Sequence, residues 1–439
     1  MKYSKINIEN SKRIIESKEI INIARNNDKH FTRNRKINVK DLILYNLNKK
    51  GLSSKMEIEE FTEICNIADI SAPGMLKQRE KLNSEVFKYL NDNSMKLFYE
   101  EYKNEVKKYK GYLLIAEDGS DFEIPNSPKT RKEFESKNAR ANKENIARSH
   151  VSMSFDILNK FVLTTQIDTY RANEIKMMRE NHKEIKRLIK EHKIIRIMDR
   201  AYVSMIDMYY SIRNDDKFLI RMAINDFIKE RKAMQTDDEM IKIHGNYDRL
   251  RHWKKDETVY QYFKNKDNYI EVRIVNLELS TGEIETVITN LTQEEFTKEE
   301  LFKLYGMRWG TETNYHYLKE SMKITNISSS KLNIIKQDIL SQVFVFNMLQ
   351  GIQNDLESEI KQEKYKYKMK ININMAVGYI KKYLIFIMLN DDEKERERLF
   401  DILNNKILKH IVPIREGRKY ERKKHTLDNR YSINKRKSF

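Results

Sequence analysis

The sequence predicts a folded α/β protein that begins with a helical region. Apolar residues recur at helical spacing in residues 1–105, and from Tyr112 onward the pattern changes to short apolar and alternating runs, which are typical of strands. Hydrophobic residues make up 39% of the 439 residues, which is enough for a buried core. At about 150 residues per domain, the chain has room for two or three folding units.

Residues 1–105 are predicted to form a helical N-terminal DNA-binding region. Apolar residues lie at helical spacing in Val39–Leu47 and in Ser71–Leu90. Basic residues alternate with the apolar ones in the second segment, and such a helix can enter a DNA groove. The candidate DNA contacts on it are Lys77, Arg79 and Lys81.

Residues 106–225 are predicted to form the first part of a catalytic core built on a sheet. The run from Tyr112 to Glu117 and the segments HVSMSFDI (150–157) and KFVLTTQID (160–168) predict three neighbouring strands. Predicted helices near 172–191 and 204–213 precede a fourth strand in IIRIMDRAY (194–202) and a fifth in FLIRMAI (218–224). The predicted order is therefore β-β-β-α-β-α-β.

Residues 226–285 interrupt this rhythm and are predicted to form a β-rich insertion. The segments VYQYF (259–263), YIEVRIVNLEL (269–279) and EIETVITNL (283–291) alternate as strands do. Residues 286–352 are predicted to complete the core with a helix from Lys298 to about Lys323 and another near 332–352. Residues 353–439 are predicted to be a helical, basic C-terminal region whose tail, Arg415–Lys437, has little apolar content.

The charge balance favours a polyanionic partner. Lys and Arg number 84 against 66 Asp and Glu, a net charge of +18. An excess of this size suits DNA through phosphate contacts and counterion release. A solvated surface, a membrane-surface protein and a ribosome-associated protein are the alternatives that charge alone leaves open.

The single cysteine indicates a reducing compartment, and the hydropathy of the chain indicates no membrane segment. The single Cys65 excludes an internal disulfide and a cysteine-based zinc site, so any metal must be held by oxygen or histidine. The start of the chain lacks the apolar run of a signal sequence, and no run of about 18 apolar residues occurs. We expect a cytoplasmic protein with no membrane partner.

Two aspartates follow buried strands. Asp118 comes directly after Tyr112–Glu117, and Asp199 closes Ile194–Met198. A side chain at the carboxyl end of a buried strand points into the crevice at the sheet edge. Taken singly, each could instead be an ordinary turn or helix-cap Asp.

A predicted helix adds a third carboxylate with basic and aromatic neighbours. At about 100° per residue, the residues of the pattern Tyr-x2-Arg-x3-Glu-x6-Lys fall within roughly 60° of one another on one helix face. An apolar stripe alongside can anchor the helix to the core. A solvated face with helical ion pairs is the alternative. The four residues are Tyr305, Arg308, Glu312 and Lys319.

These residue types suit phosphodiester cleavage. One metal ion lowers the pKa of an attacking water or hydroxyl, and a second stabilises the leaving oxygen at roughly 3.5–4 Å from the first. Three carboxylates supply the oxygen ligands that Mg²⁺ prefers. Arg308 and Lys319 can then neutralise phosphate charge.

At these positions the sequence resembles the DDE transposases of bacterial insertion sequences, in the insertion-sequence-four type group with the Tyr-x2-Arg-x3-Glu-x6-Lys signature. The resemblance extends over roughly residues 30–350 and is weakest in 225–280. Ala201 departs from it, because Gly is more usual there. The other matching segments are Phe31–Leu47, Lys77–Leu82, Glu117–Ser120 with Pro125, Asp199–Tyr202, Thr289–Leu291 and Leu301–Trp309.

The resemblance implies a ribonuclease H-like core, with a mixed five-stranded sheet and a β-rich insertion before the final Glu. It implies cut-and-paste movement of an insertion sequence by metal-dependent hydrolysis at the element ends and strand transfer. Asp118, Asp199 and Glu312 would hold two Mg²⁺ ions, for which Mn²⁺ can substitute. Tyr305, Arg308 and Lys319 would contact terminal phosphates. The implied partners are double-stranded DNA, as terminal inverted repeats and target, and a second copy of the chain on paired ends.

Three further residues are candidate DNA contacts. Arg200 directly follows the second aspartate, and His316 lies about 20° from Tyr305 on the same predicted helix. Trp253 could stack on a flipped base, although packing in the insertion is the stronger interpretation. Two other function classes stay open, a metal-dependent nuclease on the same core and a non-catalytic DNA-binding relative.

Overall fold

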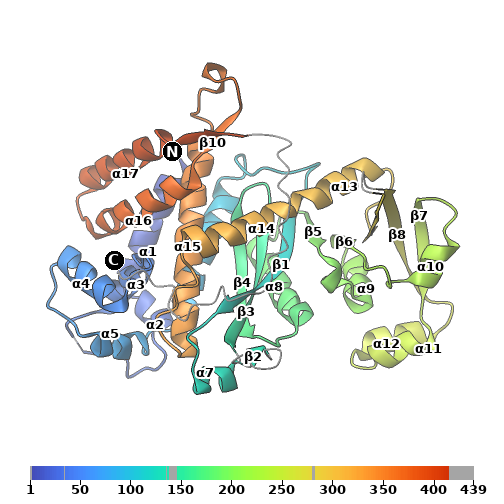
Figure 1. Cartoon of the computed structure of the whole chain (residues 1–439), viewed down its shortest axis with the longest axis horizontal. Coiled ribbons are helices and arrows are strands. Elements are labelled where there is room, and N and C mark those ends of the chain that lie inside the picture. The colour runs from blue at the N-terminus through green and yellow to red at the C-terminus, as the bar shows by residue number, and fades with distance from the viewer. Residues whose placement is uncertain (1, 34, 135, 138–145, 279–281, 415–439) are drawn as a thin grey trace.

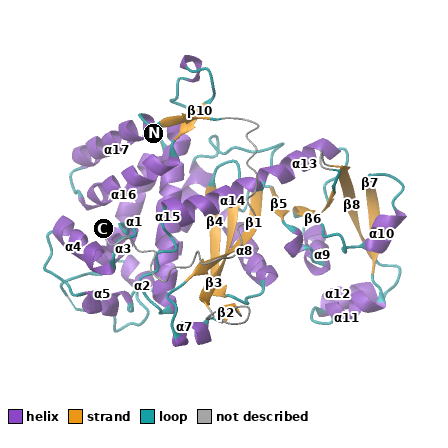
Figure 2. Cartoon of the chain, in the orientation of Figure 1, coloured by secondary structure: helices purple, strands orange, loops and turns teal. Residues whose placement is uncertain are grey.

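The molecule has a helical bundle at one end, a sheet through its middle and a smaller α/β unit at the other end (Figures 1 and 2). The computed structural model describes residues 2–33, 35–134, 136–137, 146–278 and 282–414. The expectation for the basic stretch Arg415–Lys437 therefore lies outside the described residues. Within these ranges, no helix is both long and apolar enough to cross a membrane.

Nine of the described strands form one large mixed sheet in the order β2-β3-β1-β5-β6-β9-β8-β7, with β4 paired to β3. A separate antiparallel pair is formed by β10 (Met369–Ile371) and β11 (Ile411–Pro413). Strands β1, β5 and β6 run parallel, and β3 is antiparallel to both β1 and β4. The strands are β1 (Leu113–Glu123), β2 (Ser136–Lys137), β3 (Ile146–Asp156), β4 (Phe161–Thr169), β5 (Ile194–Met198), β6 (Lys217–Arg221), β7 (Asp238–His244), β8 (Tyr269–Glu278) and β9 (Ile284–Thr289). The predicted order β-β-β-α-β-α-β is thus present, and the sheet continues beyond it through β9, β8 and β7.

Helices cover both faces of the central strands, which explains why β5 and the first half of β1 are buried without alternation and are apolar except for Glu117 and Arg196. Helix α8 (Glu174–Leu188) packs on β3 and β4, while α14 (Trp309–His316) contacts β1 and α15 (Leu332–Glu357) contacts β4. Helices α7 (Pro128–Glu133) and α9 (Met205–Arg213) complete this region.

The N-terminal residues are helical and pack on the long helix α15. Helix α3 (Val39–Leu47) has the predicted bounds, because Asn38 and Asp41 form a capping box at its start. Helices α1, α3 and α6 all contact α15, and their apolar residues join those of α15, α16 and α17 in one core. The remaining helices of the bundle are α1 (Tyr3–Glu16), α2 (Ile20–Ala24), α4 (Ser54–Cys65), α5 (Ala72–Arg79), α6 (Glu85–Lys96), η1 (Leu97–Glu101), α16 (Ile373–Leu389) and α17 (Glu393–Leu408).

The predicted β-rich insertion is wrong in part, because it also contains helices. VYQYF, predicted as a strand, belongs to α12 (Glu257–Lys264). Val259 and Phe263 are both buried and lie four residues apart, a spacing that fits a helix as well as a strand, and Asp256 caps the helix start. The other insertion helices are α10 (Ile228–Ala233) and α11 (Tyr247–Trp253), while β8 and β9 occur where strands were predicted.

The predicted single helix from Lys298 to Lys323 is present as three consecutive segments. They are α13 (Lys298–Met307), α14 and the π-helix η3 (Tyr317–Ser321). The backbone tightens at the first junction, where the amide of Arg308 bonds the carbonyl of Tyr305 at 3.0 Å. Gly306 and Gly310 flank this turn and weaken regular helix there.

Candidate active site

Asp118 and Asp199 lie side by side on neighbouring parallel strands. The last register pair of β1 and β5 joins Glu117 to Met198, and each aspartate is the next residue. Paired strands lie about 4.8 Å apart, so the two backbones are adjacent at this point. The prediction that Asp118 ends its strand is wrong, because β1 continues to Glu123 in its pairing with β3.

The helical run α13–α14 carries the third carboxylate across the same end of the sheet (Figure 1). The Tyr305 hydroxyl donates to Asp199 Oδ1 at 3.4 Å, and Arg308 Nη2 lies 3.6 Å from Glu312 Oε1. Arg308 is only 3% exposed and lies over the ring of Tyr305 at 5.6 Å. Tyr305, Arg308 and Glu312 thus each lie near at least one of the two aspartates.

Arg308 is the central positive charge of this site. Burial lowers the pKa of its guanidinium, but Tyr305, Asp118 and Asp199 outweigh burial and hold it above its ordinary value. Its Nε is buried and has no hydrogen-bond partner among the described residues. A buried, unpaired donor surrounded by carboxylates suits the binding of an anionic group.

The surroundings of Asp118 disfavour the charged form of its carboxyl. Burial raises the pKa of its carboxyl to about 6, and the nearby Glu312 and Glu174 add to the rise. Arg308 and the Gly119 amide offset only part of this effect. A carboxyl in such a setting gains from a cation.

We tested whether the residues present fit a divalent cation. Among the described residues, no group of three or more His, Cys, Asp or Glu side chains is arranged closely enough to hold a metal ion. The donors are nevertheless carboxylate oxygens, the type that Mg²⁺ and Mn²⁺ prefer. Asp118 lacks balancing charge, and the Glu312 side chain is 44% exposed. The donor type and the charge therefore fit, and the side chains must converge when a cation binds.

Lys319 and Tyr315 attach the helix to β1. Lys319 Nζ donates to Ser120 Oγ at 2.5 Å and to the Asp121 carbonyl at 3.1 Å, and burial lowers its pKa. The Tyr315 hydroxyl donates to the carbonyl of Asp118 at 2.8 Å. Tyr315 was not among the predicted site residues, although its place three residues after Glu312 puts it on a neighbouring part of the same helix.

A group of polar side chains lies on the other face of β1, and the sequence did not predict it. There, Glu117 is fully buried, and burial raises the pKa of its carboxyl to about 8, while Ser154 Oγ donates to it at 2.6 Å. His150 and Glu174 lie nearby, beside Gly119. The relevant residues come from β3 and α8, whose positions depend on the order of strands in the sheet.

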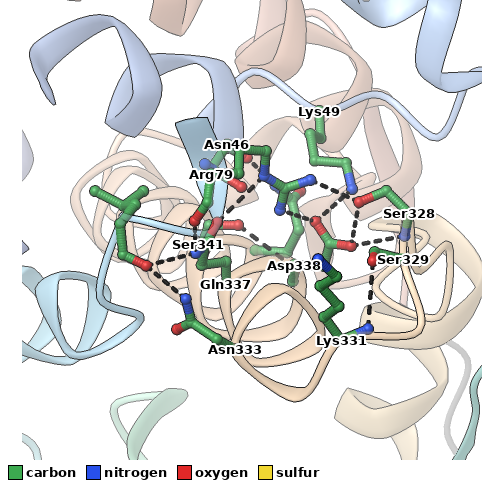
Figure 3. A network of polar contacts seen from close by, with 12 residues as sticks. Asn46, Lys49, Arg79, Ser328, Ser329, Lys331, Asn333, Gln337, Asp338 and Ser341 are labelled. Carbon is green, nitrogen blue, oxygen red and sulfur yellow. Dashed lines mark hydrogen bonds and ion pairs between the residues drawn. The ribbon is translucent and has the colours of Figure 1, made fainter. Parts of the chain in front are cut away.

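Among the N-terminal basic residues, the predicted contact with DNA is wrong for Arg79. Its side chain is 2% exposed and points into a network between α5 and α15, where Nη2 lies 2.6 Å from Asp338 Oδ1 (Figure 3). Lys49 Nζ lies 2.6 Å from the same oxygen. Arg79 is therefore a structural residue of the bundle and is not available to DNA in this conformation. Lys77 is exposed and Lys81 half-buried, so their contact with DNA stays a prediction.

Trp253 likewise packs inside the protein. It is 7% exposed and its ring lies 4.9 Å from that of Phe263, in the core of the insertion. This burial agrees with packing, the stronger of the two interpretations of Trp253, and does not favour stacking on a flipped base. Arg200 and His316 are exposed, and their contact with DNA stays a prediction.

A comparison with protein families shows the family of this chain. A family model described as a transposase DDE domain matches residues 109–348, more than half of the chain. No curated protein matches. Among the solved structures that match is a piggyBac transposase synaptic complex with hairpin DNA, determined by cryo-electron microscopy. It is 9% identical, with a TM-score of 0.45, and the match covers 91% of this chain and 85% of that one.

Proposed function

Because this chain belongs to the DDE transposase family and is a DNA transposase, an enzyme that cleaves and joins DNA, we propose that Asp118, Asp199 and Glu312 form its catalytic centre. The observation that carries the proposal is the placement of the two aspartates. They follow the last register pair of adjacent parallel strands, and the Glu312 helix lies over them. In this proposal the enzyme moves an insertion sequence by cut-and-paste transposition.

The order of the central strands supports a ribonuclease H-like core. The five strands run β4-β3-β1-β5-β6, with β1, β5 and β6 parallel and β3 antiparallel to its two neighbours. This order agrees with the core that the resemblance implies. The insertion then enters between β6 and the Glu312 helix and adds β9, β8 and β7 to the same sheet.

The signature residues support membership of the insertion-sequence-four type group. Tyr305 and Arg308 contact Asp199 and Glu312 respectively, and Lys319 reaches the segment of β1 that follows Asp118. The contacts of Tyr305 with Asp199 and of Lys319 with β1 support this assignment, as does the ion pair of Arg308 with Glu312. A solvated helix face would not require the contacts of Tyr305 and Lys319.

Members of this family generally use divalent metal ions, and we propose two Mg²⁺ ions, with Mn²⁺ able to substitute, held by Asp118, Asp199 and Glu312. When bound, the ions supply an attacking oxygen of lowered pKa and stabilise the leaving oxygen. The chain's own contribution is positioning. The hydroxyl of Tyr315 holds the Asp118 backbone, and Tyr305 orients the Asp199 carboxylate.

Arg308 and Lys319 are proposed to bind the phosphates at the element end. Arg308 is nearly buried, and its Nε, which has no hydrogen-bond partner in the described part of the chain, can donate to a phosphate oxygen. Lys319 Nζ lies at the surface of β1 beyond Asp118, where it can meet the next phosphate along the strand. The proposed partners are double-stranded DNA, as terminal inverted repeats and target, and a second copy of the chain on paired ends.

The test is cleavage of a labelled duplex that carries one terminal repeat, identified from the inverted repeats that flank the gene. Asp118→Asn should reduce Mg²⁺-dependent cleavage at least about a thousandfold, since the group would act in the transition state, while binding of the duplex persists. Lys108→Met is the control, an exposed lysine ahead of β1. Equal cleavage by wild type and Asp118→Asn would refute the site.

Strand transfer separates a transposase that moves DNA from the alternative nuclease on the same core. A cleaved end should join covalently to a supercoiled target plasmid, and the joined product should require Asp199 and Glu312 as well as Asp118. Cleavage without joined product would favour the nuclease. Binding with neither product would favour the non-catalytic relative.

A further inference from the structure

Four polar side chains form a connected group on the face of the sheet behind Asp118. Successive residues of a strand point to opposite faces. Ser120 and Phe122 meet Lys319 on the side of the Glu312 helix, whereas Gly119 faces α8. Asp118 shares the face of Ser120, so the group lies on the opposite one. We call it the back-face network, and its members are Tyr202, Glu174, His150 and Asp121.

Each member of the back-face network contacts the next. The Tyr202 hydroxyl donates to Glu174 Oε1 at 2.7 Å. His150 Nε2 lies 3.9 Å from the same oxygen, and His150 Nδ1 donates to Asp121 Oδ1 at 3.0 Å. Tyr202 is 1% exposed, and the His150 side chain is 14% exposed. The tyrosine and the imidazole are thus buried, while the Glu174 and Asp121 side chains are each 31% exposed.

Gly119 makes room for the network directly beside the first aspartate. A Cβ at this position would lie 2.4 Å from Glu174 Oε1 and 2.7 Å from His150 Nε2, closer than atoms can approach. Both side chains therefore press against the backbone of β1 at the residue that follows Asp118. Any movement of Glu174 or His150 would change the support of that backbone.

The back-face network joins the two chain segments that follow the catalytic aspartates. Asp121 lies three residues after Asp118 on β1, and Tyr202 lies three residues after Asp199, in η2 (Arg200–Tyr202). Glu174 stands in the first turn of α8, where Asn173 caps the helix. The first turn of α8 and His150 on β3 therefore bridge the ends of two strands whose own pairing stops at Glu117 and Met198.

We propose that the back-face network positions Asp118 and Asp199 relative to one another, so that their carboxylates converge when divalent cations bind. This inference rests on the proposed function. The described pairing of β1 with β5 ends at Glu117 and Met198, so the spacing of the next two residues depends on other contacts, and the network supplies such contacts from behind. Residues that support metal ligands in this way commonly change metal affinity about 10–100-fold when replaced.

The charges of the network agree with such a role. Burial lowers the pKa of His150, but the hydrogen bond to Asp121 and the charge of Glu174 outweigh burial and raise it. The His150 ring lies between the carboxylates of Glu174 and Asp121, at 3.9 Å from the first and 3.0 Å from the second. Nothing in the proposed phosphate or metal binding uses these residues directly, so their arrangement needs another explanation.

Tyr202→Phe tests the proposal because it removes one buried hydroxyl and keeps the ring. We expect the Mn²⁺ concentration for half-saturation of the DNA-free protein, measured by electron paramagnetic resonance, to rise about tenfold. Cleavage should recover toward the wild-type rate at high Mn²⁺. Duplex binding, measured without metal, should stay unchanged.

Tyr99→Phe is the matched control. The Tyr99 hydroxyl is buried and donates to Asp156 Oδ2 at 2.6 Å, at the far end of β3. Both variants lose a buried tyrosine–carboxylate hydrogen bond and should lose similar stability in urea. Only Tyr202→Phe should change Mn²⁺ affinity. Equal Mn²⁺ affinity in the two variants would overturn the proposal.

A second pair of variants keeps the test independent of folding. Glu174→Gln retains an oxygen that accepts from Tyr202, whereas Glu174→Ala removes it, and the side chain is 31% exposed. Glu174→Ala should weaken Mn²⁺ binding more than Glu174→Gln does, and the reverse order would overturn the proposal. If Asp118→Asn and Asp199→Asn leave Mn²⁺ affinity unchanged, the proposed catalytic centre itself fails. If they weaken it and the network variants do not, only this inference fails.

Discussion

Replacing Arg79 by Met should destabilise the protein by about 3 kcal/mol, because it leaves a buried carboxylate with one cation instead of two. Asp338 is 1% exposed, and Arg79 Nη2 and Lys49 Nζ both lie 2.6 Å from its Oδ1 (Figure 3). Removing one partner of a buried ion pair costs about 3–5 kcal/mol, and the remaining Lys49 places the loss at the lower end. Arg79 Nη1 also gives up a 2.6 Å hydrogen bond to Ser328.

The same network predicts how the loss depends on pH. Burial raises the pKa of Asp338, but Arg79 and Lys49 outweigh burial and hold it well below the ordinary value of 3.8. A lowered pKa in the folded state stabilises the protein above the unfolded-state value, and this stabilisation disappears as the pH falls through the folded-state value. In Arg79→Met the pKa of Asp338 is less depressed, so acid unfolding should begin at a higher pH than in the wild type.

Urea unfolding at pH 7, followed by circular dichroism, measures the change, and Lys77→Met is the control. Lys77 lies two residues before Arg79 in α5 and is exposed. Its replacement should leave stability within about 0.5 kcal/mol, as for surface residues generally, and should reduce salt-sensitive duplex binding if Lys77 contacts phosphate. Equal unfolding midpoints for the two variants would refute the structural role given to Arg79.

Two further predictions concern the site and the insertion. Because the pKa of Asp118 is raised to about 6, protons compete with the cation, and Mn²⁺ affinity of the DNA-free protein should fall about tenfold per pH unit below that value and level off above it. A titration that gives the same affinity from pH 5 to pH 8 would contradict this. Trp253→Ala should lower the free energy of unfolding by about 3–5 kcal/mol through a cavity beside Phe263. Loss of end cleavage without loss of stability would instead point to a DNA contact.

The sequence predicted elements well where local signals fix them. Helix α3 has the predicted bounds because Asn38 and Asp41 close a capping box, and β5 has them because its four apolar residues and the buried Arg196 stand between charged neighbours. The strand predicted for VYQYF is wrong because the spacing of Val259 and Phe263 fits both a helix and a strand. In short segments the periodicity does not decide between the two.

The site residues also divide into those that local spacing predicts and those whose position depends on the fold. Tyr305, Arg308 and Glu312 share one helix face that their spacing reveals, but the meeting of that face with Asp118 and Asp199 depends on strand order. The burial of Arg79 could not be predicted, since its partner Asp338 lies 259 residues away in the chain. The back-face network was missed for the same reason, because β1, β3, α8 and η2 meet only in the folded protein.

The most direct test of the catalytic centre is a crystal structure of the protein with a terminal-repeat duplex and Mn²⁺, with the ions located by anomalous scattering. The account predicts two Mn²⁺ peaks about 4 Å apart, with Asp118, Asp199 and Glu312 as ligands and Arg308 on a phosphate. Peaks bound by other carboxylates, with Asp118 and Asp199 pointing apart, would contradict it.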